Sequence, residues 1–501
     1  MQLLDLAPEL VEQIVDWSMP SGFESLALTC KALYGLCSSR IKLHNLGKKW
    51  KHVAYEPAYW QVDVFRILHE ISKEPLIARC IESLDLSHRH YGLYSKPDGP
   101  GPDPRKDENA ILGIKQTIQG SVLRSYLEEA GIDLEVWWET LLREANSDLE
   151  DGKENLDGPF LTLSLALMLP NLKKLALPEG WGTAFPDSTH GHGEKLLPIW
   201  SLLDTLVMRA NSPNHGARPF GRLESICPSL NQGYERKYGM DMAQWFIQMP
   251  SVTALYAVSC LAVDDGYTGR EFHWRLPQFK SNLTRLELAY CCMDEAGIST
   301  VLSGMPSLQV FKYDHEIKWH GCLFDWNPGL FLESVAQHCG HNLTELAISA
   351  NDINETENGI HSFHSFPRLK KLEFNVGVLS GPPVGSGQKR GMRGESPEGE
   401  EEWQEQELPC LATMLPSSLE ELAVDFTFTM DEVALRALLE NFPQERAARL
   451  PNLRKAVFRQ WHVDTARSLI EGAGCELKAF DEFEHQWLRE FEDAVGSIVH
   501  D

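Results

Sequence analysis

A short apolar motif recurs along most of this 501-residue chain: a leucine, a second leucine three positions later, and another apolar residue two positions after that. Copies of the motif begin at Ile81, Leu172, Leu203, Val252, Leu283, Leu308, Leu343, Leu369, Leu419 and, in degenerate form, Leu453. A single core stops growing near roughly 250–300 residues, so a chain of this length needs several domains or an elongated array. Repetition of one motif favours the array, in which neighbouring units stack and share a continuous core.

Proline and helix caps mark the register of the motif. A proline stands two residues before five copies, at Pro170, Pro250, Pro306, Pro367 and Pro451, where it ends a preceding helix. Caps and helical apolar spacing predict helices at 294–305, 327–339 and 431–442. The pattern resembles that of leucine-rich repeats, whose period is about 20–29 residues, with insertions in the longer units. It predicts an α/β fold over residues 81–480: a curved leucine-rich-repeat solenoid with a parallel sheet inside and helices outside.

The residues between the leucines point to the other side of each strand, because successive strand side chains alternate. We therefore expect a row of charged side chains along the inner face of the sheet, and we predict that they bind a target protein. These residues are Lys174, Arg285, Glu287, Lys312, Glu345, Lys371, Glu373, Glu421 and Lys455. Their mixed signs suit an oriented protein partner better than a polyanion. Ordinary solvated charge is the alternative interpretation.

Three further segments differ in pattern from the repeats. Residues 51–80 are interpreted as a helical connector, and residues 481–501 as a C-terminal capping helix. The insertion 381–407 has almost no apolar residues and seven glutamates from Glu395 onward. Such a composition buries too little surface to offset the entropy lost on ordering, so we predict a disordered acidic loop that is dispensable for folding.

Residues 1–50 form a unit of their own. Pro8 suits the first turn of a helix, and apolar residues then recur at helical spacing up to Trp17. Ser21 and Glu24 have the spacing of a capping box before a second amphipathic stretch. Short helices in about 45 residues bury little area, so we expect this segment to pack against the rest of the chain or another protein.

The segments LAPEL (6–10) and LALTCKALYGL (26–36), at this separation, resemble an F-box of the form common in fungal proteins. Ala7 departs from the family, which more often has proline directly after the leucine. The resemblance implies docking on the small adaptor of SCF ubiquitin ligases and, through it, on a cullin. The implied contact residues are Leu6, Pro8, Leu10, Ile14, Leu26, Cys30, Lys31 and Leu33. The alternative is that these helices only cap the first repeat.

Composition and motifs exclude several function classes. Lys+Arg number 46 and Asp+Glu number 72, a net charge of −26, which argues against nucleic acid and anionic membranes as partners. Eleven cysteines without a CxxC pair do not resemble a disulfide framework or a zinc site. No signal peptide and no apolar run of spanning length is evident, so we expect a cytoplasmic or nuclear protein. No nucleotide-binding, hydrolase or metalloprotease motif occurs, so we expect no catalysis and no cofactor or metal.

Two functions fit these observations. The first is the substrate-recognition subunit of an SCF-type ubiquitin ligase, whose solenoid binds an unknown target protein. The second is a leucine-rich-repeat scaffold that binds proteins without a link to ubiquitination.

Overall fold

The structure is a computed structural model in which the chain forms two compact units. The first unit comprises residues 1–184 and 197–224, and the second comprises residues 185–196 and 225–501. The residues described are 3–19, 22–54, 64–87, 102–151, 158–178, 181–182, 197–213, 218–232, 237–263, 271–317, 326–350, 356–389, 401–426, 432–460, 463–479, 485–496 and 499–500. Among them, no helix is long and apolar enough to cross a membrane.

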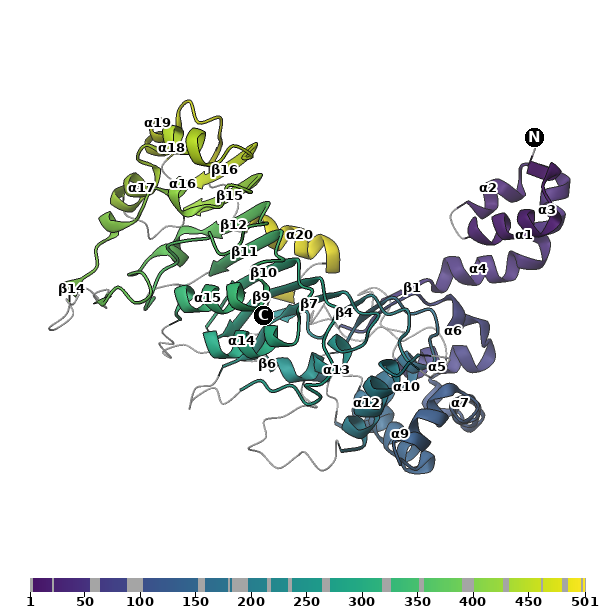
Figure 1. The fold of residues 1–501 in the computed structure, drawn as a ribbon. Helices are drawn as coiled ribbons and strands as arrows, with labels where there is room; N and C mark the ends of the chain where they lie inside the picture. The colour runs from purple at the N-terminus through teal and green to yellow at the C-terminus, as the bar shows by residue number, and fades with distance from the viewer. Residues whose placement is uncertain are drawn as a thin grey trace. The chain divides into compact units, whose positions relative to one another are not determined.

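Four short helices open the first unit (Figure 1). They are α1 (Pro8–Trp17), α2 (Phe23–Ala27), α3 (Lys31–Cys37) and α4 (Ile41–Trp50). A small core joins them, made of Val15, Phe23, Ala27 and Cys37, with Leu26 and two other partly buried side chains packed against it. The predicted capping box lies partly outside the described residues, since Ser21 is not among them. Glu24 instead contacts Lys48 and His44 on α4, so its side chain holds two helices together rather than capping one.

The rest of the first unit combines helices with three parallel strands. The helices are α5 (Val64–Lys73), α6 (Leu76–Cys80), α7 (Glu108–Gln119), α8 (Val122–Glu129), α9 (Leu134–Asp151), α10 (Pro159–Leu167) and α12 (Leu197–Ala210). The strands are β1 (His52–Ala54), β2 (Ser83–Asp85) and β3 (Lys174–Ala176). In register, Val53 lies opposite Leu84, and Leu84 opposite Leu175. Residues 51–80 are thus more than a helical connector, because they supply a strand.

The motif beginning at Leu203 is not a strand, which corrects the sequence interpretation. It lies within α12, where Ile199, Leu202, Leu206 and Val207 are fully buried. A leucine followed by apolar residues at the third and fourth positions also forms the stripe of an amphipathic helix, so the motif alone was ambiguous. The strand that follows this helix is β4 (Ser225–Cys227), in a stretch that carries no copy of the predicted motif.

The second unit is built on parallel strands that follow one another in chain order. They are β4, β7 (Ala254–Val258), β9 (Arg285–Met293), β10 (Val310–His315), β11 (Glu345–Ala350), β12 (Lys371–Asn375), β15 (Glu421–Phe426), β16 (Lys455–Gln460) and β17 (Glu476–Ala479). Matching motif positions pair across strands, so Leu286, Phe311, Leu346 and Leu372 lie opposite one another in turn. A helix follows most of these strands, which confirms an α/β fold with parallel strands.

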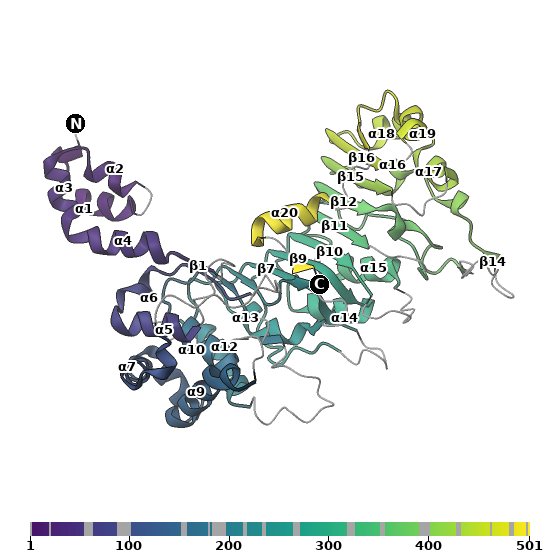
Figure 2. The ribbon, with the colours of Figure 1, turned by 180° about the vertical axis from the view of Figure 1, so that it is seen from behind.

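Helices cover the leucine side of these strands (Figures 1 and 2). The predicted helix at 294–305 is α14 (Glu295–Ser303), whose N-cap Asp294 accepts a hydrogen bond from the Gly297 N–H. The predicted helix at 327–339 is α15 (Pro328–Cys339), capped by Asn327 through the Leu330 N–H at 2.9 Å. The others are α13 (Gln244–Ile247), α16 (Leu411–Met414), α17 (Glu432–Leu439), α18 (Phe442–Arg449) and α19 (Val463–Ile470).

The acidic insertion is partly ordered. Residues 390–400 lie outside the described residues, but β13 (Gln388–Lys389) and β14 (Glu401–Glu402) pair in parallel on either side of that gap. Trp403 is only 3% exposed and packs edge-on against His361. The prediction that all of 381–407 is disordered is therefore wrong for its two ends. The buried tryptophan contributes apolar area to the end of the insertion that follows the gap.

The last helix, α20 (Gln486–Val495), does not cap the end of the array (Figure 1). Its residues Trp487 and Phe491 contact the inner-face residues Ser349 and Tyr256 of β11 and β7. Beyond it, β18 (Val499–His500) pairs in parallel with β5 (Asn231–Gln232) of the same unit. The C-terminal segment thus crosses the face of the strands opposite α14 and α15 (Figure 2).

Candidate protein-binding surfaces

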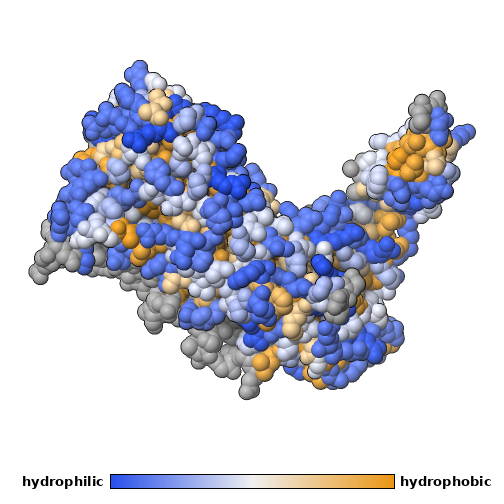
Figure 3. Space-filling model, in the orientation of Figure 1, coloured by the Kyte–Doolittle hydropathy of each residue, from blue (hydrophilic) through white to orange (hydrophobic). Residues whose placement is uncertain are grey.

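The N-terminal helices expose large apolar side chains that their own small core leaves uncovered. Trp17 is 79% exposed and Leu28 80% exposed, and three others share this surface: Leu4, Leu10 and Tyr34. Figure 3 shows apolar residues gathered on these helices. Half of the exposed large hydrophobic residues in the described chain fall in this short stretch. A contiguous apolar surface of this kind is typical of a protein-binding site.

The structure divides the predicted adaptor-binding residues into three groups. Pro8, Leu10, Cys30 and Lys31 are exposed, and Leu6, Ile14 and Leu26 are half-buried. Leu33 is only 2% exposed, so it belongs to the interior of this helical domain and does not lie on its surface. The helical spacing of Leu33 predicted an apolar stripe, and the stripe faces inward at this position. Trp17 and Leu28, which are not among the eight, are the most exposed apolar side chains of the region.

Ion pairs hold the helices that carry this apolar surface. Arg40 contacts Asp16 and lies 3.6 Å from Glu12, both on α1. Glu24 accepts a hydrogen bond from Lys48 at 2.8 Å, and Lys48 with His44 lowers the pKa of that glutamate. His44 itself stacks on Phe23, with ring centroids 4.4 Å apart. These contacts hold α4 against α1 and α2.

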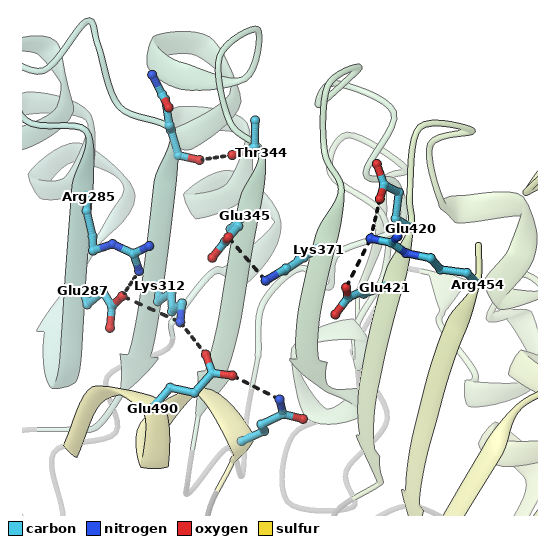
Figure 4. A network of polar contacts seen from close by, with 12 residues as sticks. Arg285, Glu287, Lys312, Thr344, Glu345, Lys371, Glu420, Glu421, Arg454 and Glu490 are labelled. Carbon is cyan, nitrogen blue, oxygen red and sulfur yellow. Dashed lines mark hydrogen bonds and ion pairs between the residues drawn. The ribbon is translucent and has the colours of Figure 1, made fainter. Parts of the chain in front are cut away.

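The inner face of the second unit carries charged residues in rows that run across the strands. In one row Glu345, Lys371, Glu421 and Lys455 lie in register on β11, β12, β15 and β16. Opposite charges alternate along this row, and Lys371 lies 3.6 Å from Glu345 (Figure 4). Alternating cross-strand charges stabilise the pairing of neighbouring strands and leave no large potential of one sign.

A second row lies one pair of residues further along the strands. It contains Tyr256, Glu287, Lys312, Ala347, Glu373, Ala423 and Val457. Arg285, which is in register with the first row, lies 2.5 Å from Glu287 of the second. Lys312 lies 3.7 Å from Glu287 and 3.0 Å from Glu490 of α20 (Figure 4). Glu287 is 2% exposed and Lys312 6% exposed, which corrects the expectation that both are open to solvent.

The remaining predicted target-binding residues differ in accessibility. Lys371 and Lys455 are exposed, whereas Arg285, Glu345, Glu373 and Glu421 keep intermediate exposure. Lys174 is exposed on β3 and belongs to the first compact unit rather than to this surface. Eight of the nine predicted residues therefore share one face of the second unit, and Glu287 and Lys312 are buried there.

Burial beneath α20 changes the pKa values of several ionisable side chains on this face. Burial raises the pKa of Glu373 to about 7, against the opposing effect of Arg459. It raises the pKa of Asp425 to about 6 and that of Asp314, which accepts a hydrogen bond from Ser349, to about 7. His485 Nδ1 lies 3.3 Å from Asp425 Oδ2, and burial lowers the pKa of this histidine to about 4. The uncharged forms of these groups are thus favoured where α20 meets the strands.

A groove runs beside α20 on the same face. It is lined by Ala347 and Ala423 and by charged residues of five strands together with α20. The polar lining residues are Lys312, Glu345, Lys371, Glu373, Glu421, Lys455, Gln486 and Glu490. In the described part of the chain, no three His, Cys, Asp or Glu side chains are placed to hold a metal ion. The groove therefore presents charges of both signs around small apolar side chains.

No protein-family model matches this chain, and no curated protein matches it.

Proposed function

We propose that this chain is the substrate-recognition subunit of an SCF-type ubiquitin ligase, with an F-box-like domain at residues 1–50 and a leucine-rich-repeat solenoid after it. The supporting observation is the exposed apolar surface of α1–α3, where Trp17 and Leu28 are about four-fifths exposed. Leaving such side chains in water is unfavourable unless a partner covers them. Three of its residues, Leu10, Leu28 and Tyr34, lie in the two segments that bear the F-box resemblance.

In this proposal the chain makes and breaks no bond. The N-terminal helices dock on the ligase adaptor and, through it, on a cullin, while the inner face of the second unit holds a target protein. Binding both at once raises the effective concentration of a target lysine near the charged ubiquitin carrier. The chain needs neither cofactor nor metal for this role, and cytoplasm or nucleus is the compartment where such a complex works.

One observation favours the alternative of a scaffold unconnected to ubiquitination. The helix α4 of the N-terminal domain contacts α6, and Lys42 of α4 forms an ion pair with Glu74, which lies just before α6 in the sequence. This is the contact expected if the helices only cap the array. It leaves the surface around Leu10 and Leu28 uncovered, however, so capping explains one side of the domain and not the other.

Adaptor capture by the full-length chain separates the two functions. We expect L10D with L28D to abolish co-purification with the SCF adaptor, because each aspartate would be an unpaired charge at an apolar contact. The melting temperature should stay nearly unchanged, since Leu10 and Leu28 are 47% and 80% exposed. The matched control is Leu112→Asp, the same change at a leucine of α7 that is 52% exposed and lies outside the N-terminal helices.

The control variant should capture the adaptor as the wild type does. Adaptor binding that survives the double substitution, or that the wild-type chain lacks, would favour the scaffold.

A further inference from the structure

The helix α20 makes four kinds of contact with the inner face of the second unit, and the first is at its N-terminus. The N-cap residue His485 makes no side-chain capping hydrogen bond. Instead the Trp487 N–H donates to Oε1 of Glu373 on β12 at 3.3 Å. A carboxylate at this position satisfies a free backbone donor and complements the positive end of the helix dipole. The strand thus caps the helix.

The second contact orients the first aromatic residue of the helix. Trp487 is 1% exposed, and its Nε1–H donates to Oγ of Ser349 at 3.2 Å. The Ser349 hydroxyl in turn donates to Asp314 at 2.6 Å, which fixes the serine oxygen as the acceptor. An indole that is buried with its N–H paired contributes both apolar area and a specific geometry.

The third and fourth contacts lie one helical turn further on. Oε2 of Glu490 lies 3.0 Å from the Lys312 ammonium (Figure 4). Phe491 is fully buried and meets the ring of Tyr256 edge-on, with centroids 5.8 Å apart. Leu488, directly after the tryptophan, is also buried, at 2% exposed. Two aromatic anchors four positions apart are the usual means by which a groove recognises an amphipathic helix.

These contacts depend on only five features of the docked helix. They are a helix N-terminus, tryptophan at the second helical position, leucine directly after it, a carboxylate three positions beyond the tryptophan and an aromatic residue four positions beyond it. The outward side of α20 carries Arg489 and Asp493, which are exposed. A ten-residue helix is marginally stable alone, so its docking must also supply the free energy of helix formation. That cost makes α20 a comparatively weak occupant of its site.

We propose that the inner face of the second unit is a receptor for an acidic, aromatic amphipathic helix of the target protein, and that α20 is the intramolecular occupant which this helix displaces. The inference rests on the proposed function, because it names the chemistry of the target. Tethering gives α20 a high effective concentration, often millimolar. A target helix that lacks some of these contacts therefore does not displace α20 from the inner face. In this way α20 sets the minimum affinity that a target needs for binding.

A peptide with the sequence of residues 485–496 tests the receptor site in the full-length chain. The chain carries W487A and F491A, so that its own α20 lacks both anchors, and the probe is the fluorescently labelled wild-type peptide. We expect saturable binding at least about tenfold tighter than to the unsubstituted chain, in which α20 competes. A peptide with Glu490→Lys should bind at least fivefold more weakly, because it meets Lys312 with a like charge.

The matched control peptide carries Asp493→Lys, the same change of charge on the exposed side of the helix, and should bind as the wild-type peptide does. Equal weakening by Glu490→Lys and Asp493→Lys would show attraction by net charge alone and overturn the proposal. So would absence of saturable binding to a W487A/F491A chain that circular dichroism and a cooperative melting transition show to be folded.

Hydrogen exchange in the unsubstituted chain provides a second measurement that does not depend on the double variant folding. Excess peptide should speed the exchange of the α20 amides, because the displaced helix frays. Unchanged exchange at saturating peptide, or a chain that sediments as a dimer by exchanging α20 with a second copy, would overturn the proposal. Adaptor capture is absent from all of these assays, so their failure is distinct from failure of the proposed function.

Discussion

Glu373 lies beneath the first turn of α20, where it accepts a backbone hydrogen bond and has its pKa raised to about 7 by burial. An exposed glutamate titrates near 4.5, so at intermediate pH Glu373 is protonated while α20 is docked and loses that proton when α20 is released. A raised pKa of this kind favours docking fully below about pH 4 and loses that contribution as the pH rises through 7. Asp425, with a pKa of about 6, acts in the same direction.

His485 acts in the opposite direction, because its pKa is lowered to about 4 and its contribution is lost as the pH falls below about 6.5. The other charged groups that face this turn are Lys312, Glu490 and Arg459. Asp314 reaches α20 only through the Ser349 hydroxyl, so the titrating groups in direct contact with the helix or its N-cap are Glu373, Asp425 and His485. Summing the three titrating groups, we expect the labelled peptide of residues 485–496 to bind the W487A/F491A chain about fivefold more weakly at pH 8 than at pH 6. The measurement is a titration at both pH values.

The control for this pH dependence is Glu373→Gln, which keeps an acceptor for the helix N–H and cannot ionise. In this variant the peptide should bind equally well at both pH values, or more weakly at pH 6 than at pH 8, because His485 then contributes most of the pH dependence. An unchanged fivefold weakening in that variant would mean that another group carries the proton.

Lys312 and Lys371 give a matched pair of lysines on neighbouring parts of the same face. Lys312 is buried between Glu287 and Glu490, whereas the Lys371 side chain is 53% exposed beside Glu345. We expect K312E to lower the melting temperature by several degrees, because breaking a buried pair leaves charges uncompensated at a cost of about 3–5 kcal/mol. K371E should change it by about one degree or less, since exposed pairs contribute roughly 0–1 kcal/mol.

Thermal unfolding of the two variants side by side provides the measurement. Equal melting temperatures would show that α20 does not enclose Lys312 in solution. Reversing the charge of Lys312 would therefore affect folding as well as target binding. Lys371 and Lys455, which are exposed, are the suitable positions for charge reversals that test target binding alone.

At the scale of elements, α12 and the acidic insertion show where local pattern and tertiary structure diverge. The insertion orders at both ends through β13, β14 and Trp403. We expect W403A to lower the free energy of unfolding by about 3–5 kcal/mol, the usual effect of removing a large buried aromatic side chain. Trp17→Ala is the matched control, because that tryptophan is 79% exposed.

Replacing residues 390–400 by a short Gly/Ser linker should leave the melting temperature unchanged, since loop closure free energy depends only weakly on length. Differential scanning calorimetry of the three variants checks both expectations. A linker variant that melts as low as W403A would assign the packing to residues 390–400 themselves.

At the scale of the whole molecule, the two candidate surfaces belong to different compact units. The apolar surface of α1–α3 lies in the first and the inner-face receptor in the second, and each unit has its own buried residues. Two sites affect one another only through an element whose equilibrium both of them bias. We expect L10D with L28D to leave peptide binding to the W487A/F491A chain unchanged, within about twofold.

Peptide titrations with and without the two aspartates check this independence. A change well beyond twofold would reveal coupling between adaptor docking and the receptor face. Conversely, saturating peptide should not alter the capture of the adaptor by the Leu10 and Leu28 surface.

The sequence by itself determined the elements whose pattern is local. Strands β7, β9, β10, β11, β12, β15 and β16 follow from apolar residues at alternate positions, which place one face in the core, and α14 and α15 follow from the caps Asp294 and Asn327. The same alternation placed Glu345, Lys371 and Glu421 together on one face. These features depend on residues a few positions apart, whose periodicity is written directly in the sequence.

Only the tertiary structure decided which of these positions are covered. Leu33 faces inward and Trp17 outward although both lie on amphipathic helices, because burial depends on which helix lies alongside. Glu287 and Lys312 are buried because α20, some two hundred residues further along the chain, packs on them. Contacts over that separation leave no periodic mark in either segment, so the occupant of the inner face could not be predicted from the sequence.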